Sequence, residues 1–402
     1  MAFDKLIRFF IYVILISLAI SPSFALGDGD RNLLLIGIMG IVGPIVIIVL
    51  PKFYHGDKLI FLFIASILII PFLFNPGSIR WSTIFYSIMF CLTFLAYKRL
   101  LLKGFFSVEL YLHFLKKIIF AFAIVLLIQQ LCVLTGLPIF NENNYRPTTP
   151  WKLNSLTAEP SHFARILGLL MYCYISISEI KNNSNYNFKT LFKQDKKIWC
   201  AFLWSMLTMG SGTAILFVGI IFLKISKIKS IIQTILCGLL LFTILNYFES
   251  SALGRSSKVF SAILTLDVNA IIEADHSASI RIVPVIILSQ MVGISTTNDW
   301  FGHGIDHVSS FLSNLIPGVH EGISGGGMFQ LWFEYGFVVF VIFMIIIVQA
   351  GFNRKDLFSL LFLFLLVFLY GVNSQMVWLC IALLFTNKYF FNLKSEIKYG
   401  NT

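Results

Sequence analysis

The sequence predicts an all-α integral membrane protein that crosses a bilayer about twelve times, and three observations lead to this fold class. Hydrophobic residues make up 58% of the 402 residues and charged residues only 12%, a balance that would leave large apolar patches exposed on a soluble monomer. The apolar residues form continuous blocks, which favours helices over the alternating strands of a barrel. Most of the positive residues lie in short segments between these blocks.

The expected spans follow from the blocks, because a hydrocarbon core about 30 Å thick needs roughly 20 apolar residues in a helix. The spans cover residues 7–26, 33–50, 59–74, 81–97, 114–135, 161–180, 198–210, 212–224, 230–248, 328–350, 357–371 and 374–390. Region 198–224 is divided at the Gly-Ser-Gly turn 210–212, because a single span there would carry Lys224 and the lysines after it to the outer side. Residues 1–402 are therefore expected to form a single membrane domain.

The positive residues predict which side each segment occupies. With both termini in the cytoplasm, most of the 30 lysines and arginines lie inside. The exceptions are Arg31, Arg80, Arg146, Lys152, Arg165, Arg255, Lys258 and Arg281. The beginning of the chain, with Lys5 and Arg8 before an apolar run, also imitates a cleavable signal peptide. A retained first span fits better, because many spans follow.

Two long segments, 136–160 and 249–327, are then expected on the outer side. The second contains Ile271, Ile272 and an apolar stretch at 282–294, a composition that predicts a partly helical, ordered loop. The net charge of +11 is explained by topology, so no nucleic-acid partner is expected. The six cysteines lie at or within apolar runs without C-x-x-C spacing, so neither disulfides nor a metal site is expected.

The sharpest polar motif runs from Thr157 to Arg165. Pro160 suits a first helical turn, and Glu159 would lie at the positive end of the helix dipole. Arg165 lies inside the expected span, where ionisable groups usually line a cavity, and His162 shares its face. A helix cap with an arginine that reaches the outer headgroups explains the same residues, so the motif leaves both interpretations open.

Further polar candidates lie in the outer turn and the long loop. Ser211 and Thr213 belong to the small-residue turn Gly210–Thr213. The backbone N–H groups of this turn could form an anion-binding nest, or its small residues could allow tight helix packing. Arg255 and Arg281 match phosphate oxygens, although acidic residues in the loop offer surface partners. Trp300–His307 is a dense polar and aromatic run, and Gly302 and Gly304 argue against the helix that a metal-binding His303–His307 pair would need.

Glu334, near the outer end of the span 328–350, would be either a buried partner for an arginine or exposed at the rim. The sequence contains no P-loop, no dinucleotide fingerprint and no D-x-D pair. These absences argue against an enzyme that is driven by nucleotides.

In the order and spacing of these features, most of the chain resembles the O-antigen polymerase and ligase superfamily of bacterial inner membranes, which includes the Wzy-type polymerases. The shared features are Glu159–Ser161 at the start of a span, the small-residue turn Gly210–Thr213, Ser279-x-Arg281, Trp300–Gly304 as the "G-x-G" step, and Phe329–Gly336 as the "E-x-G" segment. Ligases tend to carry a His-Asn pair before the last segment. This chain has His320 followed by Glu321 instead, which favours a polymerase.

The resemblance implies glycosyl transfer at the periplasmic side, which polymerises undecaprenyl-pyrophosphate-linked oligosaccharides into O-antigen or a related surface polysaccharide. An acceptor hydroxyl would attack the anomeric carbon of the donor chain, and the lipid pyrophosphate would leave, without metal or other cofactor. Glu159, His303 or His320 would accept the proton. Fixed cations would hold the leaving group, and the expected set for it is Arg165, Arg255 and Arg281, with His162, Ser211 and Thr213 as further binding residues.

The implied partners are the lipid-linked oligosaccharides, membrane lipids, a chain-length regulator and a flippase. The nearest alternative is an O-antigen ligase that transfers finished chains to lipid A–core. A flippase for lipid-linked sugars is an alternative of another class. Flippases commonly show internal repeats and broken helices with charges in mid-span, whereas the two halves of this chain show no repeat and the ionisable residues gather at the outer ends.

Overall fold

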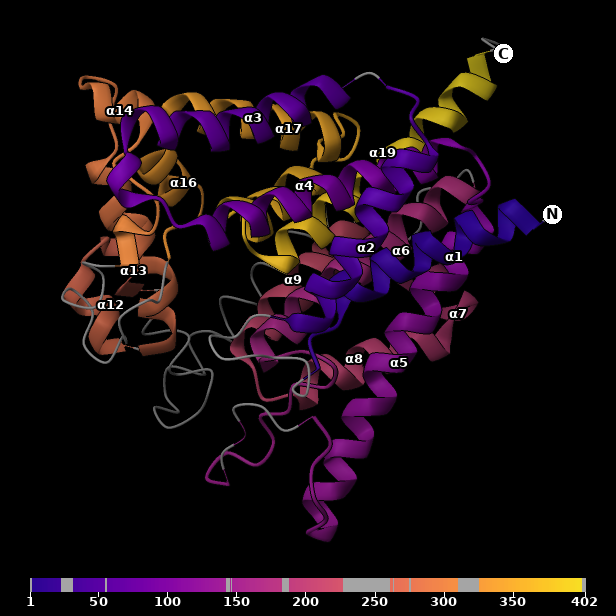
Figure 1. Ribbon diagram of the computed structural model, residues 1–402. Helices are drawn as coiled ribbons and strands as arrows, with labels where there is room; N and C mark the ends of the chain where they lie inside the picture. Colours follow the sequence, from indigo (N-terminus) through magenta and orange to yellow (C-terminus); the bar gives the residue numbers. More distant parts are fainter. Residues whose placement is uncertain are drawn as a thin grey trace. The chain divides into compact units, whose positions relative to one another are not determined.

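Every regular element among the described residues is a helix, as the sequence predicts. The computed structural model (Figure 1) describes residues 2–22, 32–54, 56–141, 145, 147–182, 188–226, 261–262, 264–274, 276–309 and 325–399. Five helices in these ranges are long and apolar enough to cross a membrane. They are α3 (Asp57–Phe74), α4 (Trp81–Leu102), α5 (Val108–Thr135), α6 (Pro160–Asn182) and the Gln375–Lys394 part of α19 (Gln375–Tyr399).

Several shorter apolar helices match the remaining expected spans. They are α2 (Leu33–Val49), α9 (Gly212–Ile225), α17 (Phe337–Gly351), and α18 (Phe358–Leu363) with the π-helical η3 (Phe364–Phe368). A further short apolar helix, the Ser279–Met291 part of α13 (His276–Met291), lies in the segment 249–327 that is expected outside the spans. The expected span 230–248 lies outside the described residues. The chain is thus a helical protein of membrane type, and the count of about twelve crossings stays a prediction.

The chain divides into two compact units. The first comprises Met1–Gly37, Lys103–Ser256 and Phe385–Thr402, and the second comprises Ile38–Leu102 and Ser257–Leu384. The first unit contains α1 (Ala2–Ala19), α5, α6, α7 (Phe188–Gln194), α8 (Lys196–Thr208) and α9. The second contains α3, η2 (Pro76–Ser78), α4, α12 (Val268–Ala274), α13, α14 (Thr297–Phe301), α16 (Gly327–Tyr335), α17, α18 and η3.

In the first unit, the predicted break between two short helices is confirmed. Helix α8 ends at Thr208 and α9 begins at Gly212. Gly210 lies between them with φ +66°, and a Cβ on it would be 3.0 Å from the carbonyl oxygen of Trp151. A left-handed φ and such a close approach both favour glycine, so the turn is fixed by its contact with the preceding outer segment.

In the second unit, the expectation of one continuous span over 328–350 is wrong. Helix α16 ends at Tyr335, and Gly336 has φ +91° before α17 begins. A Cβ on Gly336 would lie 2.2 Å from the carbonyl oxygen of Trp300, so the break is held by a backbone contact from the long loop. The nine residues of α16 reach only about 14 Å at 1.5 Å per residue, and we place this helix outside the spans.

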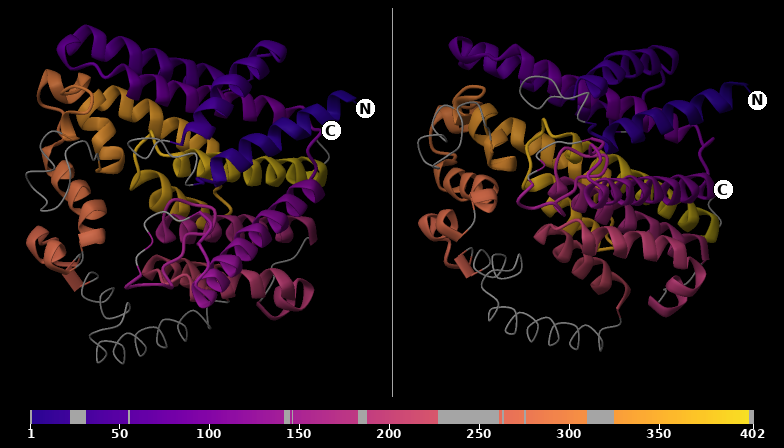
Figure 2. Two further views of the ribbon diagram at one scale, coloured as in Figure 1. Left: turned by 60° about the horizontal axis from the view of Figure 1, so that its bottom comes forward. Right: turned by 90° about the horizontal axis from the view of Figure 1, so that it is seen from below.

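Part of the long outer segment is folded, as its composition predicts. Helices α12 and α13 lie side by side in each view of the chain (Figures 1 and 2). Ile271, Val283 and Ile286 are buried between them with Ala262. Helix α3 runs beside α17 in the same unit (Figure 1).

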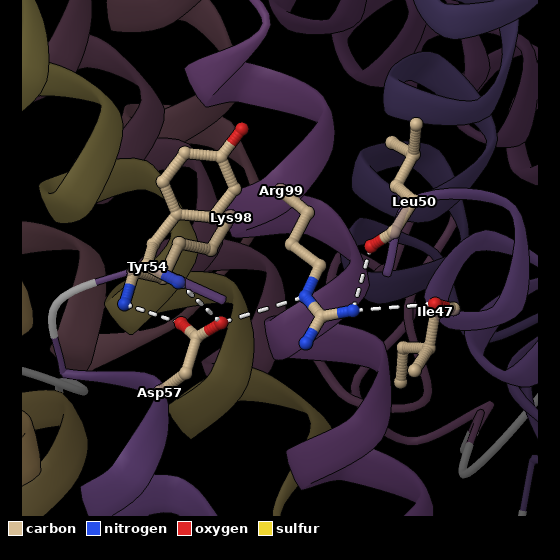
Figure 3. A network of polar contacts seen from close by, with 6 residues as sticks. All are labelled: Ile47, Leu50, Tyr54, Asp57, Lys98 and Arg99. Carbon is tan, nitrogen blue, oxygen red and sulfur yellow. Dashed lines mark hydrogen bonds and ion pairs between the residues drawn. The ribbon is translucent and has the colours of Figure 1, made fainter. Parts of the chain in front are cut away.

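A buried ionic cluster fixes the turn between α2 and α3 to α4 (Figure 3). Asp57 has no exposed surface, and its carboxylate lies 2.7 Å from Lys98 Nζ and 3.5 Å from Arg99 Nε. The Tyr54 N–H also donates to Asp57, at 3.1 Å. Arg99 Nη1 donates to the carbonyl oxygens of Leu50 and Ile47 at 2.7 and 3.2 Å, where a cation is favoured by the dipole of α2.

Contacts within each unit join segments that the lysine pattern assigns to one side of the membrane. The inner contacts are Lys98–Asp57, Lys116–Asp195, Lys181–Glu109 and Lys224–Glu179, and the outer ones are Ser78–Ile305, Arg80–Asp306 and Trp151–Gly210. If successive loops alternate between the two sides of the membrane, only loops on the same side can contact each other, as these pairs do. Which side faces the cytoplasm stays a prediction.

Candidate functional site

The predicted site residues are divided between the two units. Glu159, His162, Arg165, Ser211 and Thr213 belong to the first unit, and Arg281 and His303 to the second. Arg255 and His320 lie outside the described residues.

The polar motif of the first unit sits at the start of α6. The helix begins at Pro160, as predicted. The Phe163 N–H donates to the Glu159 carbonyl at 3.0 Å, which makes Glu159 the capping residue. Ser161 Oγ donates to Glu159 Oε2 at 2.8 Å, and the Glu159 side chain is half-buried. The carboxylate therefore lies at the positive end of the helix, where its charge is stabilised.

Helices α6 and α9 run parallel, and this direction places their N-termini at the same end. A Cβ on Gly168 of α6 would lie 2.6 Å from the Phe217 ring of α9. Further along both helices, Lys224 Nζ lies 3.4 Å from Glu179 Oε2.

The shared end of these two helices brings together the predicted residues of the first unit. The side chain of Arg165 is buried, and those of Glu159, His162, Ser211 and Thr213 are half-buried. Two helix N-termini and a buried guanidinium form an environment that favours an anionic group.

A buried network anchors the segment that leads into Glu159. Gln129 of α5 has no exposed surface, and its Oε1 accepts from the Ser155 N–H at 2.8 Å. Its Nε2 donates to the Phe140 carbonyl at 2.8 Å and to Asn154 Oδ1 at 3.2 Å. Thr157 Oγ1 donates to the Glu159 carbonyl at 2.8 Å. The network thus fixes the segment 154–159, including the capping residue Glu159, relative to α5.

In the second unit, the loop of residues 302–308 lies against α16. The His303 N–H donates to the Phe333 carbonyl at 2.9 Å, and the Gly304 N–H donates to the Glu334 carbonyl at 3.3 Å. Gly302 has φ +91° and Gly304 has φ +112°, which confirms that the glycines exclude a helix at this point. The two segments that carry the "G-x-G" and "E-x-G" resemblance are therefore in direct contact.

The outer turn after α3 holds the same loop from the other side. Asn75 Nδ2 donates to the Gly302 carbonyl at 2.9 Å, and the Ile305 N–H donates to the Ser78 carbonyl at 3.2 Å. Arg80 pairs with Asp306 at 2.9 Å. Just before the loop, Thr296 and Asp299 form a capping box on α14, and the backbone N–H of Thr296 contributes most to lowering the pKa of Asp299.

Glu334 is buried, at 3% exposure, rather than exposed at the rim. No cation among the described residues forms an ion pair with it, and Arg80 pairs with Asp306 instead. Its carboxyl group accepts from the Val308 N–H at 3.3 Å and from Gln330 Nε2 at 3.2 Å. Burial raises the pKa of Glu334 from 4.5 to about 8, because a charged carboxylate loses its hydration there.

The two predicted residues of the second unit lie on elements that touch α16. The ring of His303 stacks on Phe333, with centroids 4.2 Å apart and planes 5° apart. Arg281 is half-buried on α13. Three residues further along that helix, Pro284 Cγ lies 3.1 Å from a Cβ placed on Gly325, just before α16 begins. His303 and the helix of Arg281 are thus gathered around one short helix.

Sequence reasoning gave no role to Gln129 or Ser155, and it left Glu334 undecided. Two adjacent glutamines, Gln129 and Gln130, within the apolar run 114–135 are the signal that could have identified the anchor of the first unit. Comparisons with family models, with curated proteins and with solved structures give no match to this chain.

Proposed function

We propose that the chain polymerises polysaccharide at the periplasmic side of the bacterial inner membrane, with both termini in the cytoplasm. It joins undecaprenyl-pyrophosphate-linked oligosaccharide repeats, as an O-antigen polymerase of the Wzy type does. The donor already carries an activated pyrophosphate bond, so the proposed transfer uses neither a nucleotide nor a metal ion. The hydroxyl of the acceptor chain forms the new bond to the anomeric carbon as the bond to the lipid pyrophosphate breaks.

The observation that supports this proposal best is the shared end of α6 and α9 in the first unit. A leaving pyrophosphate needs fixed positive charge in a site poor in water, and an attacking hydroxyl needs a proton acceptor. The N-terminal end of two parallel helices, with Glu159 directly before α6 and Arg165 buried within its first two turns, offers both kinds of group. In the proposed reaction, Arg165 with Ser211 and Thr213 holds the pyrophosphate, and Glu159 accepts the proton.

The second unit carries two further groups of the kinds that the proposed reaction needs. Arg281 is a cation whose planar guanidinium group forms paired hydrogen bonds with phosphate oxygens, and His303 is a second candidate for the proton acceptor. The ring of His303, which stacks on Phe333, belongs to the segment 249–327 that the lysine pattern assigns to the outer side.

Deletion of the gene in its own cells separates this function from its rivals. We expect that the deletion strain carries lipid A–core capped with single repeats and lacks long chains, and that the intact gene restores the long chains. Absence of even single repeats on lipid A–core would contradict the proposal and indicate a ligase. Accumulation of lipid-linked repeats that face the cytoplasm would contradict it in favour of a flippase. The readout is the ladder of lipopolysaccharide on a gel.

A further inference from the structure

The loop of residues 302–308 packs so closely against α16 and the turn after α3 that its two glycines leave no space for a side chain. A Cβ on Gly302 would lie 2.2 Å from the Glu334 carbonyl oxygen, and a Cβ on Gly304 would lie 2.2 Å from Ser78 Oγ. Backbone therefore touches backbone on one side and the α3 turn on the other. A loop so closely packed keeps its place only if its amide groups remain bonded.

The Glu334 carboxyl group provides one of these bonds from inside the protein. Val308, whose N–H donates to Glu334 Oε1 at 3.3 Å, has no exposed surface and packs with Leu288 and Phe333. A buried N–H without an acceptor loses its hydration without compensation, which destabilises the folded loop. The bond between Val308 and Glu334 thus attaches one end of the loop to α16, and the bond between His303 and Phe333 attaches the other end.

The groups around Glu334 act on its carboxyl group in opposite directions. Its two hydrogen-bond donors, the Gln330 amide and the Val308 N–H, lower its pKa, whereas burial is the largest effect and raises it. Asp306 adds negative charge and raises the pKa of Glu334 further. Besides Tyr335 on α16 itself, the elements packed against this helix carry several titratable and charged groups, which are Arg281 on α13, Asp299 on α14, and His303, Asp306 and His307 on the loop, with Arg80 paired to Asp306.

The same loop sets the tautomer of His303. Its Nδ1 lies 3.2 Å from the Phe333 carbonyl oxygen, and a carbonyl oxygen only accepts hydrogen bonds. The proton of the neutral ring must then be on Nδ1, which leaves the lone pair of Nε2 able to accept a proton.

We propose that Glu334 is a positioning residue: its carboxyl group accepts the hydrogen bond of the Val308 N–H, holds the loop 302–308 on α16, and so presents His303 Nε2 as a proton acceptor. The role of His303 as a base rests on the proposed function. The position of Glu334 is independent of it.

Two matched variants of the full-length protein test the position. Glu334→Gln keeps an oxygen acceptor for the Val308 N–H, whereas Glu334→Ala removes it. We expect that hydrogen exchange of the 302–308 amides is at least roughly tenfold faster in Glu334→Ala and unchanged in Glu334→Gln, since exchange reports local opening. The amides of α4 serve as the internal control for global unfolding. Equal protection of the loop in both variants would overturn the proposal.

The pH dependence of stability tests the burial of Glu334 against the loop. Burial raises the pKa of Glu334 to about 8 in the folded protein, whereas the unfolded chain has the ordinary pKa of a glutamate. The stabilisation is therefore complete below about pH 4.5 and is lost as the pH rises towards about 8. We expect the melting temperature of the wild type to fall, relative to that of Glu334→Gln, between pH 5 and pH 8. Parallel profiles would show that Glu334 is not buried against the loop and would overturn the proposal.

Chain extension by the same variants tests the link to His303. We expect Glu334→Gln to make long chains and Glu334→Ala to lose at least roughly tenfold in extension rate, because a misplaced base transfers protons poorly. If the loop opens in Glu334→Ala while extension is unchanged, the positioning part stands and the role of His303 as base is overturned. Inactivity of the wild type itself would instead contradict the proposed function.

Discussion

Replacing Asp57 by asparagine is expected to lower the free energy of unfolding by about 3–5 kcal/mol, the usual cost of removing one partner of a buried ion pair. Asparagine has nearly the same size and still accepts from the Tyr54 N–H, so packing changes little. Lys98 and Arg99, whose side chains are 9% and 1% exposed, would be left without the carboxylate. The measurement is the denaturation midpoint of the purified protein in detergent.

Two further variants show whether charge causes the loss. Lys98→Met keeps Asp57 paired with Arg99 and preserves the apolar stem, so it is expected to cost less than Asp57→Asn. Adding Lys98→Met to Asp57→Asn removes one of the two uncompensated cations and is expected to restore part of the lost stability, because neighbouring charges are not additive. A double variant no more stable than Asp57→Asn alone would contradict this account.

Substitution of Glu159 or Arg281 by alanine is expected to reduce chain extension by roughly 100-fold or more, the scale of losing a general base or a fixed electrostatic contact. Both variants are expected to reach the membrane in normal amounts. The measurement is the length distribution of surface polysaccharide, together with the quantity of protein in isolated membranes.

Conservative variants separate the proposed roles from a structural effect. Glu159→Gln retains shape and hydrogen bonding but cannot accept a proton, so it is expected to be as inactive as the alanine variant. Ser161→Ala removes only the hydroxyl that donates to Glu159 and is expected to remain active. Arg281→Lys keeps the charge without the planar fork and is expected to be intermediate. Long chains made by Glu159→Gln would remove Glu159 from the role of base.

The sequence was sufficient to predict most helices, because apolar blocks and glycine turns report local structure directly. Helix α6 begins at Pro160, and α8 and α9 separate at Gly210, as predicted. The expected continuous span over 328–350 was wrong for a physical reason. Composition shows that a block is apolar, but the turn at Gly336 depends on contact with Trp300, which is distant in the chain.

The candidate site was predictable only where its residues are close in sequence. The place of Glu159 at the start of α6 was predicted from the local pattern, and its bond from Ser161 is local too, although the pattern left the role of Glu159 open. The bonds from Gln129 to Ser155 and from Glu334 to Val308 join different elements, and no local pattern specifies such pairs. Burial of Glu334 without a cation likewise depends on where α16 packs.

The proposed function requires that the segments containing Thr148 and Asn298 lie on the side of the membrane opposite to the lysine-rich segment at 181–197. Single cysteines at Thr148, Asn298 and Lys197, all exposed positions, test it in a protein without its other cysteines, by labelling intact spheroplasts with an impermeant maleimide. The account predicts that Thr148→Cys and Asn298→Cys react at once and that Lys197→Cys reacts only after the membrane is permeabilised. Labelling of Lys197→Cys together with Asn298→Cys in intact spheroplasts would contradict it.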